Sequence, residues 1–287
     1  MSHTPTGPLD FEDRVAFVTG TSRGIGKALA LALADHGVRV VSTGKTVDGH
    51  DRLPGTIVET TEEIRERGGE SIYVELDVRD EESVQSAVDR TVDEWGRLDF
   101  VVNNAGAIHF GNVADTPPKR FDLLMGVNAR GAYTTTHAAL PHLLDGDGGH
   151  VLNMSPPQSI DAAPGKAPYA LSKLGMTFLA KSLAGELAGQ GVAANALWPV
   201  AAIETEATRH FELGQPEDWR TPEIVADATL EVLSRDPDEF TGHALYDEDV
   251  LREAGAETFD DYAVVEGEEP GPSSARLFDP EYESNNR

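Results

Sequence analysis

The sequence of 287 residues contains no cysteine. This absence excludes disulfide bonds, thiolate nucleophiles and thiolate metal sites, although it does not decide the cellular compartment. The chain also lacks any run of about 18 consecutive apolar residues, which a membrane-spanning helix requires. Residues 1–10 lack the basic and then apolar order of a signal peptide. We therefore expect a cytoplasmic protein that does not cross a membrane.

Positive charge is scarce as well. The chain has 23 Lys and Arg residues against 50 Asp and Glu residues, which gives a formal net charge of −27. Such an acidic surface repels nucleic acid and anionic lipid, so we expect neither as a partner. The composition resembles that of proteins from salt-accumulating halophiles, in which concentrated counter-ions screen the repulsion. An acidic protein from a mesophile is the alternative interpretation.

A glycine-rich stretch near the N-terminus organises the rest of the chain. The β-prone run Val15 to Thr19 leads into it, and a helical pattern from Lys27 to His36 follows it. Glycines permit positive φ angles and close approach of a ligand, and the start of the following helix favours a pyrophosphate. We expect a bound dinucleotide here, with a purely structural turn as the alternative. The candidate cofactor-binding residues are Gly20, Thr21, Ser22, Arg23, Gly24, Ile25 and Gly26.

The next β-prone run, Val38 to Thr43, ends in Gly44-Lys45-Thr46. At this place in a dinucleotide-binding unit an acid favours the free ribose 2′-hydroxyl, whereas a cation favours a 2′-phosphate. The sequence offers Lys45 and no acid there, and Arg23 lies inside the glycine loop. These two cations predict NADP(H) in preference to NAD(H), unless both are merely solvated.

The chain continues as alternating helix and strand patterns. Thr56 to Arg67 and Arg79 to Trp95 have helical periodicity, and β-prone runs cover Ser71 to Leu76 and Leu98 to Val102. This order predicts an α/β fold, in which a parallel sheet is covered by helices on both faces. A carboxylate after the third strand can accept from the adenine amino group, unless it only caps a loop. The cofactor-binding candidates after the third and fourth strands are Asp77, Val78, Asn104, Ala105 and Gly106.

A tyrosine and a lysine four residues apart form a candidate catalytic pair. Tyr169 and Lys173 would share one face of a helix, because positions i and i+4 are neighbours. A phenol with its ordinary pKa of about 10 is a poor base at neutral pH, and an adjacent cation lowers that pKa. We expect Tyr169 to act as general acid/base beside Lys173. A partly buried aromatic next to a surface lysine is the alternative.

Four motifs occur together along the chain: Thr19-Gly20-x-x-x-Gly24-Ile25-Gly26, Asp77-Val78, Asn103-Asn104-Ala105-Gly106 and Tyr169-x-x-x-Lys173. In this order and at these spacings they resemble the short-chain dehydrogenase/reductase family over residues 11–246. The resemblance implies a single Rossmann-type doubly wound domain of about seven parallel strands, a nicotinamide cofactor and carbonyl–alcohol redox chemistry. We place this domain at residues 11–265, an N-terminal arm at 1–10, and an acidic tail containing Pro, Gly and Ser at 266–287.

The resemblance also implies roles for individual residues. Asn128 would complete a proton relay to Lys173 through a water on a helix carbonyl, although a solvent-facing asparagine is the alternative. Tyr169 and Lys173 would also contact the cofactor, with Lys173 holding the nicotinamide ribose. Ile203 and Thr205 would lie in the loop that passes the nicotinamide carboxamide. Smaller details resemble most the hydroxysteroid dehydrogenase-like protein 2 branch of the family: Lys45-Thr46, Thr116-Pro117, Asn153 to Pro157 and Asn195 to Pro199.

The sequence departs from the family pattern in two places. The usual substrate-orienting serine would stand at position 156, which is a proline. Ser155 is the nearest candidate for this catalytic role, provided that the strand has already ended there, and Ser159 lies further along the loop. The Pro-Gly pair expected after the sixth strand is here Pro199-Val200, which puts the geometry of that loop in doubt.

The remaining segments carry weaker expectations. The long helical regions near 118–144 and 167–190 would form a homodimer or homotetramer, as the resemblance implies, and residues 204–219 would cover the substrate. We expect no metal site, because Asp247, Glu248 and Asp249 lack the glycine and terminal glutamate of a calcium loop. These acids are interpreted as a solvated helix start. The tail at 266–287 is expected to be mobile or loosely packed.

Three functions remain open from the sequence. The leading hypothesis is an NADP(H)-dependent oxidoreductase that acts on a small-molecule ketone, aldehyde or secondary alcohol. The second is a cofactor-binding sensor or scaffold with impaired catalysis, which the proline at position 156 suggests. The third is an isomerase or dehydratase on the same scaffold, which would bind cofactor without a net hydride change.

Overall fold

A seven-stranded parallel sheet forms the centre of the computed structural model, which describes residues 3–49, 54–157 and 164–283. The strand order is β3-β2-β1-β4-β5-β6-β9, and each neighbouring pair is parallel. The predicted α/β doubly wound fold is thereby confirmed. The strands are β1 (Val15–Thr19), β2 (Arg39–Gly44), β3 (Ser71–Glu75), β4 (Phe100–Asn103), β5 (Gly149–Met154), β6 (Val192–Trp198) and β9 (Ala244–Tyr246).

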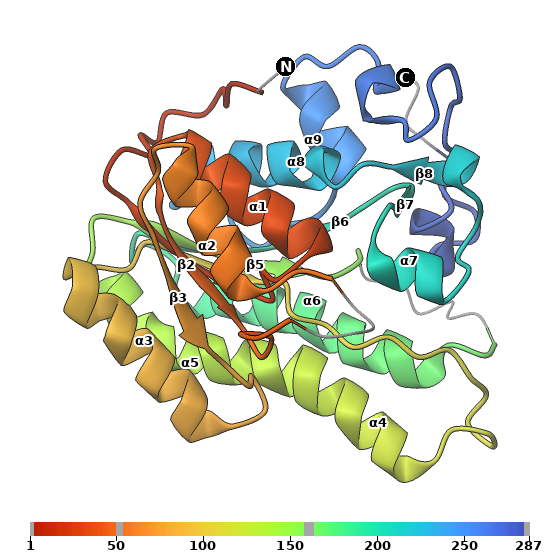
Figure 1. Cartoon of the computed structure of the whole chain (residues 1–287), viewed down its shortest axis with the longest axis horizontal. Helices are drawn as coiled ribbons and strands as arrows, with labels where there is room; N and C mark the ends of the chain where they lie inside the picture. The colour runs from red at the N-terminus through yellow and green to blue at the C-terminus, as the bar shows by residue number, and fades with distance from the viewer. Residues whose placement is uncertain (1–2, 50–53, 158–163, 284–287) are drawn as a thin grey trace.

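Helices cover both faces of the sheet (Figure 1). Ala16 and Val18 of β1 belong to the apolar core on one side, whereas Val15 and Phe17 belong to the core on the other. This alternation follows from the period of two in a strand, and it explains why strands buried on both faces are apolar throughout. The first core is completed by α1 (Gly24–Asp35), α2 (Ile57–Glu66) and α8 (Glu223–Ser234), and the second by α3 (Glu81–Trp95), α5 (Gly131–Leu144) and α6 (Ala167–Glu186).

The strand order reverses at β1, which pairs with β2 on one side and with β4 on the other. In open α/β sheets ligands bind in the crevice at the carboxyl ends of the strands beside such a switch point. Short elements form one wall of this crevice, at the right of Figure 1. They are β7 (Ala202–Ile203), which pairs with β8 (Trp219–Arg220), and the helix α7 (Glu206–His210).

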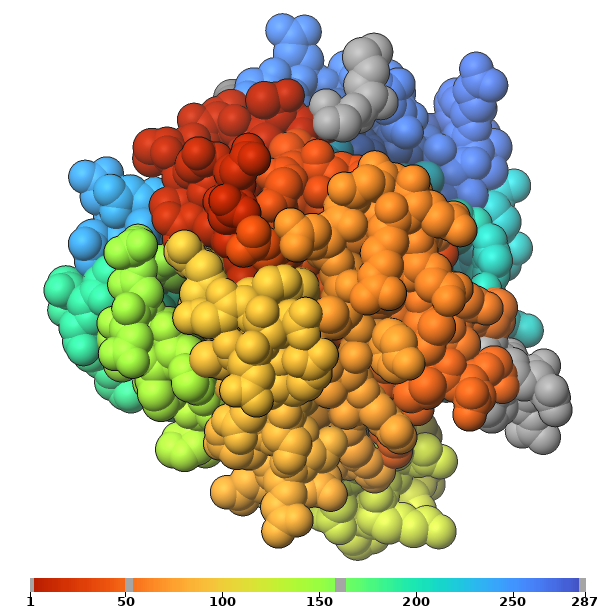
Figure 2. Space-filling view, turned by 60° about the vertical axis from the view of Figure 1, so that its left-hand side comes forward, coloured from red at the N-terminus to blue at the C-terminus, as the bar shows by residue number. Residues whose placement is uncertain are grey.

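The N-terminal arm is docked on α8. The Thr6 backbone N–H and hydroxyl donate to the buried Glu231 carboxylate at 2.8 and 2.9 Å, and the Leu9 N–H donates to the Ser234 carbonyl at 2.9 Å. Figure 2 shows the face on which the N-terminal part of the chain, red to yellow, covers the middle, with blue C-terminal parts along the upper margin. The N-terminal arm therefore lies on the same side of the sheet as α8. Within the described residues no helix is long and apolar enough to cross a membrane.

The helical region expected at 118–144 is interrupted. It consists of α4 (Pro118–Met125), one π-helical turn (Gly126–Arg130) and α5. Periodicity does not reveal such a turn, because it is a single turn inside an otherwise α-helical region. The turn carries Asn128, whose side chain is buried rather than facing solvent.

Two expectations about the C-terminal part are wrong. Asp247 and Glu248, at the start of α9 (Asp247–Glu253), are buried instead of solvated. Backbone N–H groups and arginines compensate for this burial: Asp247 accepts from the Val200 N–H at 2.8 Å, and Arg220 donates to Glu248 at 2.9 Å. The region at 266–283 is not loosely packed either, because Ala275, Phe278 and Tyr282 are buried. The polar composition of this region gave no indication that Ala275, Phe278 and Tyr282 are buried.

Candidate active site

Two adjoining cavities occupy the crevice at the carboxyl edge of the sheet. The larger, of about 680 Å³, is lined by the glycine loop and the ends of β2 and β3. The smaller, of about 520 Å³, lies between α6, the loop after β6 and the C-terminal region. Residues common to both linings include Ile25, Asn104, Gly106 and Thr205. The crevice is therefore one continuous cleft, long enough to hold an extended ligand whose end enters the smaller cavity.

The glycine loop has the geometry that its sequence predicts. Gly20 has a φ of +77°, and a Cβ there would lie 3.0 Å from the Ala105 Cα atom. A Cβ on Gly26 would lie 2.1 Å from the Gly20 carbonyl oxygen, so only glycine fits. Gly20 and residues 22–26 line the larger cavity. Thr21 is not among the described lining residues, because its buried hydroxyl points to the Thr43 carbonyl.

The residues expected after β4 tie that strand to the glycine loop. The Asn104 side-chain amide donates to the carbonyls of Thr19 at 2.9 Å and Gly20 at 3.1 Å. The backbone N–H groups of Asn104 and Ala105 donate to the Thr19 hydroxyl at 3.0 and 2.9 Å. Asn104, Ala105 and Gly106 all line the larger cavity, as does Val78. The structure thus brings these predicted cofactor-binding residues together.

At the end of β2 the expected cation is already paired. The Lys45 ammonium lies 3.0 Å from the Asp77 carboxylate, and the Arg79 guanidinium donates to the same carboxylate at 2.6 and 3.0 Å. Hydrogen bonds from Arg79, and then Lys45, hold the pKa of Asp77 well below its usual range. All three side chains line the larger cavity. Arg79 was not identified from the sequence as a site residue, although its position two residues after Asp77 could have indicated it.

Arg23 lines the larger cavity, but its guanidinium also holds the neighbouring chain. It donates to the carbonyls of Pro54 at 2.8 Å and Gly55 at 3.0 Å. Burial lowers the pKa of Arg23. The Arg23 side chain therefore stabilises residues 54 and 55 and also lines the candidate cofactor site.

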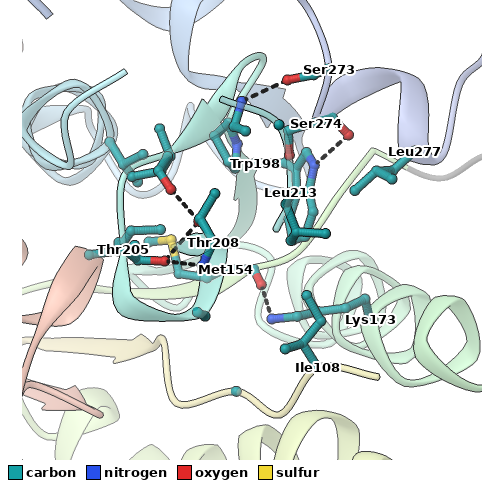
Figure 3. A pocket seen from close by; sticks show the side chains of 18 of the residues that line it. Ile108, Met154, Lys173, Trp198, Thr205, Thr208, Leu213, Ser273, Ser274 and Leu277 are labelled. Carbon is teal, nitrogen blue, oxygen red and sulfur yellow. Dashed lines mark hydrogen bonds between the residues drawn. The ribbon is translucent and has the colours of Figure 1, made fainter. Parts of the chain in front are cut away.

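Tyr169 and Lys173 both line the smaller cavity, on one face of α6. The Lys173 ammonium donates to the Met154 carbonyl at 2.8 Å and lies 5.7 Å from the centre of the Trp198 ring (Figure 3). Burial lowers the pKa of Lys173 to about 8 and raises the pKa of the Tyr169 phenol. The expected lowering of the Tyr169 pKa by Lys173 is therefore not found, because the effect of burial prevails. At neutral pH the phenol is protonated and can donate a proton, and Lys173 is still largely charged.

Asn128 joins the loop after β4 to α6. Its side-chain oxygen accepts from the Ala107 N–H at 2.8 Å, and its amide nitrogen donates to the Ala107 carbonyl at 3.0 Å and to the Ser172 hydroxyl at 2.8 Å. Ser172 in turn donates to the Tyr169 carbonyl at 2.8 Å. Asn128 therefore fixes the turn of α6 that carries Tyr169 and Lys173. Ser172 was missed, since a serine between two catalytic candidates carries no signal of its own.

Ser155 does not reach either cavity among their described lining residues. The Ser155 N–H continues the pairing of β5 by donating to the Leu197 carbonyl at 3.0 Å, and its hydroxyl is fully buried 3.0 Å from the Thr177 hydroxyl. The preceding residue, Met154, faces the smaller cavity instead. Strand alternation thus turns Ser155 away from the site. Ser159 lies outside the described residues.

Comparison with known proteins identifies the family. The family model of the short chain dehydrogenases matches residues 14–215. This chain belongs to the short-chain dehydrogenase family. The match covers the glycine loop, the Tyr169–Lys173 pair and the strands between them, so the family assignment and the geometry concern the same cleft.

Individual relatives agree with this assignment. Hydroxysteroid dehydrogenase-like protein 2 from Xenopus tropicalis is 42% identical over 254 residues, which are 88% of this chain and 60% of that protein. The predicted resemblance to this branch is confirmed, and the chain spans about three-fifths of the length of this relative. A short chain dehydrogenase from Mycobacterium thermoresistibile has a TM-score of 0.85 at 38% identity, covering 91% of this chain and 94% of its own. Carveol dehydrogenase from Mycobacterium avium, solved in complex with NAD, has a TM-score of 0.74 at 25% identity, covering 84% and 97%.

In this short-chain dehydrogenase the loop after β6 is held from both sides. Val200, which stands where a glycine was expected, donates its N–H to Asp247 at 2.8 Å, and its carbonyl accepts from the N–H groups of Ser274 and Ala275 at 3.0 and 2.9 Å. Burial raises the pKa of Asp247 to about 7. The loop then brings Ile203 and Thr205 to the cavity, as expected.

Several cavity residues of this short-chain dehydrogenase were not foreseen. Trp198, Ser273, Ser274 and Leu277 line the smaller cavity (Figure 3), together with Leu213 from the region at 204–219 that was expected to cover the substrate. These residues come from segments far apart in the sequence, and no local sequence pattern predicts that such side chains line a common pocket. Within the described part of the chain, no group of three or more His, Asp or Glu residues is placed to hold a metal ion.

Proposed function

We propose that this chain is an NADP(H)-dependent oxidoreductase that interconverts a carbonyl and an alcohol by hydride transfer, with Tyr169 as general acid/base. The observation that carries the proposal is the position of Tyr169 and Lys173. Both side chains lie in a small, largely apolar cavity that opens into a cleft built on a glycine loop and the start of α1. The Tyr169 phenol, a proton donor, thus lies where the end of a bound dinucleotide and a substrate molecule can meet.

The residues of the chain supply binding and proton transfer. The nicotinamide, when bound, supplies or accepts the hydride. In reduction Tyr169 donates its phenolic proton to the carbonyl oxygen as the carbon receives the hydride, and oxidation reverses both transfers. Lys173, held by the Met154 carbonyl, stabilises the phenolate that remains. We assign Asn128 to the relay that returns the proton, so Asn128→Ala should lower turnover, and unchanged turnover would remove it from the mechanism.

NADP(H) is proposed over NAD(H) because cations prevail where the adenosine ribose would lie. Lys45 and Arg79 share one carboxylate, Asp77, and Arg23 lines the same cavity. Among the described lining residues these three cations face two carboxylates, Asp77 and Glu206, so a net positive charge remains to attract an anionic 2′-phosphate. Carveol dehydrogenase from Mycobacterium avium binds NAD, which makes the cofactor preference a point for direct measurement.

A homo-oligomer is part of the proposal. Tyr133 on α5 and Leu171 and Phe178 on α6 are large apolar side chains that are more than half exposed. Exposed apolar side chains on neighbouring helices favour association with a second copy. Light scattering should therefore give a dimer or tetramer that Phe178→Asp dissociates; a wild-type monomer would contradict this.

A cofactor-binding sensor or scaffold with impaired catalysis is the second candidate. The observation that favours it is the absence of a serine hydroxyl from the end of β5 among the described cavity residues, since Ser155 is turned toward Thr177. Such a protein would bind the dinucleotide without turning over carbonyls.

The direct test of the proposal is Tyr169→Phe. This change removes the proton donor and keeps the ring that packs edge-on against Phe110 at 5.3 Å. We expect turnover to fall at least about 100-fold, as for loss of a general acid, while affinity for NADPH stays within about threefold. Fluorescence titration and absorbance assays on one preparation measure both. Retained turnover would remove Tyr169 from the mechanism, and joint loss of binding would show a structural role.

A further inference from the structure

The region after α9 returns to the site and docks on the loop after β6. We call residues 273–282 the C-terminal segment. The Ala202 N–H donates to the Ser273 hydroxyl at 3.0 Å, and the Trp198 indole N–H donates to the Ser274 carbonyl at 3.2 Å. Together with the two hydrogen bonds to the Val200 carbonyl, these contacts fix the start of the segment against the loop that lines the cavity.

Aromatic packing fixes the other end of the C-terminal segment. Phe278 is buried, with its ring edge-on to Trp198 at 5.4 Å and 6.1 Å from the ring of Tyr169. Tyr282 packs against Tyr246 of β9 at 4.5 Å. Leu277, next to the anchored Phe278, lines the cavity instead. In Figure 3 Ser273, Ser274 and Leu277 lie above Lys173 and Ile108, and all five residues line the same cavity.

The cavity has few polar groups left for a ligand. The hydroxyls of Thr205 and Thr208 contact each other at 2.9 Å, Thr208 also bonds the Ile203 carbonyl, and Ser273 is occupied by Ala202. Among the described lining residues the charged side chains are Lys173, beside the candidate proton donor, and Asp218. The remaining side chains are largely apolar and include Ile108, Met154, Leu213, Val225 and Leu277. Away from Lys173, a carboxylate or phosphate on the ligand would therefore meet no cation among the described lining residues.

We propose that the C-terminal segment is the substrate-selecting wall of this cavity, with Leu277 setting the length of the apolar chain of an uncharged ketone or secondary alcohol. The proposal rests on the proposed oxidoreductase function. The carbonyl end of the ligand lies at Tyr169, and its hydrocarbon part extends between Leu277 and Leu213. Because Leu277 sits between two anchored stretches, its side chain limits the cavity as a fixed stop.

The test is calorimetric binding of methyl ketones, from 2-butanone to 2-dodecanone, to the protein loaded with NADPH. For wild type we expect Kd to fall about fourfold per added methylene, the value of one buried CH₂, until the chain meets Leu277 and the gain stops. Leu277→Ala should move this limit to a chain longer by one or two carbons, and Leu277→Trp should move it to a shorter chain. Leu144→Ala, an exposed leucine outside the described lining, is the matched control and should leave the limit in place.

The outcomes distinguish the role of the C-terminal segment in ligand selection from the catalytic role of Tyr169. An unchanged limit in both Leu277 variants, with native circular dichroism, or no ketone binding at all, would overturn the proposal. A keto acid should bind at least about tenfold more weakly than the ketone of equal length, and equal binding would overturn the preference for uncharged ligands. Binding that shifts with Leu277 but never leads to NADPH oxidation would confirm the wall and count only against catalysis.

Discussion

Lys45, Asp77 and Arg79 form a cluster of ion pairs at the ends of β2 and β3, and we propose that this cluster decides cofactor preference. Asp77 was expected to accept from the adenine amino group, but both of its oxygens are engaged by Arg79 and Lys45. We interpret Asp77 as the residue that orients the two cations toward the cavity. The adenine contact remains a prediction.

Reversing the charge at Lys45 tests this interpretation. Lys45→Asp places a second carboxylate beside Asp77, so we expect the Kd for NADPH to rise about 10- to 100-fold, the range of one lost charged hydrogen bond. The Kd for NADH should stay within about threefold. Lys119→Asp, at an exposed lysine of α4, is the matched control for net charge. Equal loss of both cofactors would show that Lys45 does not read the phosphate.

The protonation of Lys173 sets a pH limit on the reaction. Burial lowers its pKa to about 8, so the lysine loses its proton as the pH rises through this value. We expect kcat/KM for NADPH, which reports groups of the free enzyme, to decrease above about pH 8 by up to about tenfold per pH unit. Lys173→Arg keeps its charge at these pH values and, if active, should lose this descending limb. A flat profile to pH 9.5 in wild type would contradict the account.

At the scale of elements, α9 supports the loop after β6 through one buried carboxylate. Asp247 accepts from the N–H groups of Val200 and Glu248 at 2.8 and 2.7 Å, and its second oxygen has no hydrogen-bond partner among the described residues. The start of α9, the loop after β6 and the C-terminal segment therefore meet at the backbone of one residue, Val200. Asp247 and Ser274 lie 47 and 74 residues after Val200, so these contacts couple segments that are distant in the sequence.

This carboxylate gives stability a defined dependence on pH. The pKa of Asp247 is raised in the folded protein to about 7, above its unfolded value, so its contribution is present at low pH and is lost as the pH rises toward 7. Asp247→Asn keeps an acceptor for Val200 and removes the titration. We expect the melting temperature of this variant, relative to wild type, to increase from pH 5 to pH 8. A constant difference over that range would show that Asp247 does not titrate there.

Within single turns, helices and strands, the sequence pattern predicted where the site residues lie. Gly20 and Gly26 need positive φ or close approach, and the i, i+4 spacing placed Tyr169 and Lys173 on one face of α6. Strand alternation argued against Ser155 unless the strand had ended, and in the structure its pairing continues. The shared face of Tyr169 and Lys173 and the orientation of Ser155 both follow from the periodicity of the helix or strand that carries them.

Contacts between distant segments were not predictable in this way. The burial of Asp247 depends on Val200, 47 residues earlier, and Phe278 is buried because Trp198 and Tyr169 are there to receive it. The π-helical turn at Asn128 depends on Ala107 and Ser172, which bind the side chain that it carries. Composition alone makes such residues look solvated or loosely packed.

For the whole molecule the net charge of −27 is the dominant property. Like charges on a compact chain repel one another, and the screening length falls from about 10 Å at 0.1 M salt to about 3 Å at 1 M. If the protein is adapted to high salt, its melting temperature should rise by about 5 °C or more between 0.1 and 2 M KCl, equivalent to about 2 kcal/mol. Sucrose at matched osmolality, which screens no charge, is the control. No increase in KCl beyond that in sucrose would favour a merely acidic protein.

The central claim is that the cleft binds NADP(H) and the Tyr169 cavity reduces a carbonyl. The most direct measurement is a nicotinamide fluorescence titration of the purified protein with NADPH and NADH in high salt, followed by NADPH oxidation with a panel of uncharged ketones and aldehydes. We expect NADPH to bind more tightly than NADH and at least one carbonyl to be turned over. Tight NADPH binding without any turnover would contradict the oxidoreductase and favour the sensor, and preference for NADH would contradict the role given to Lys45.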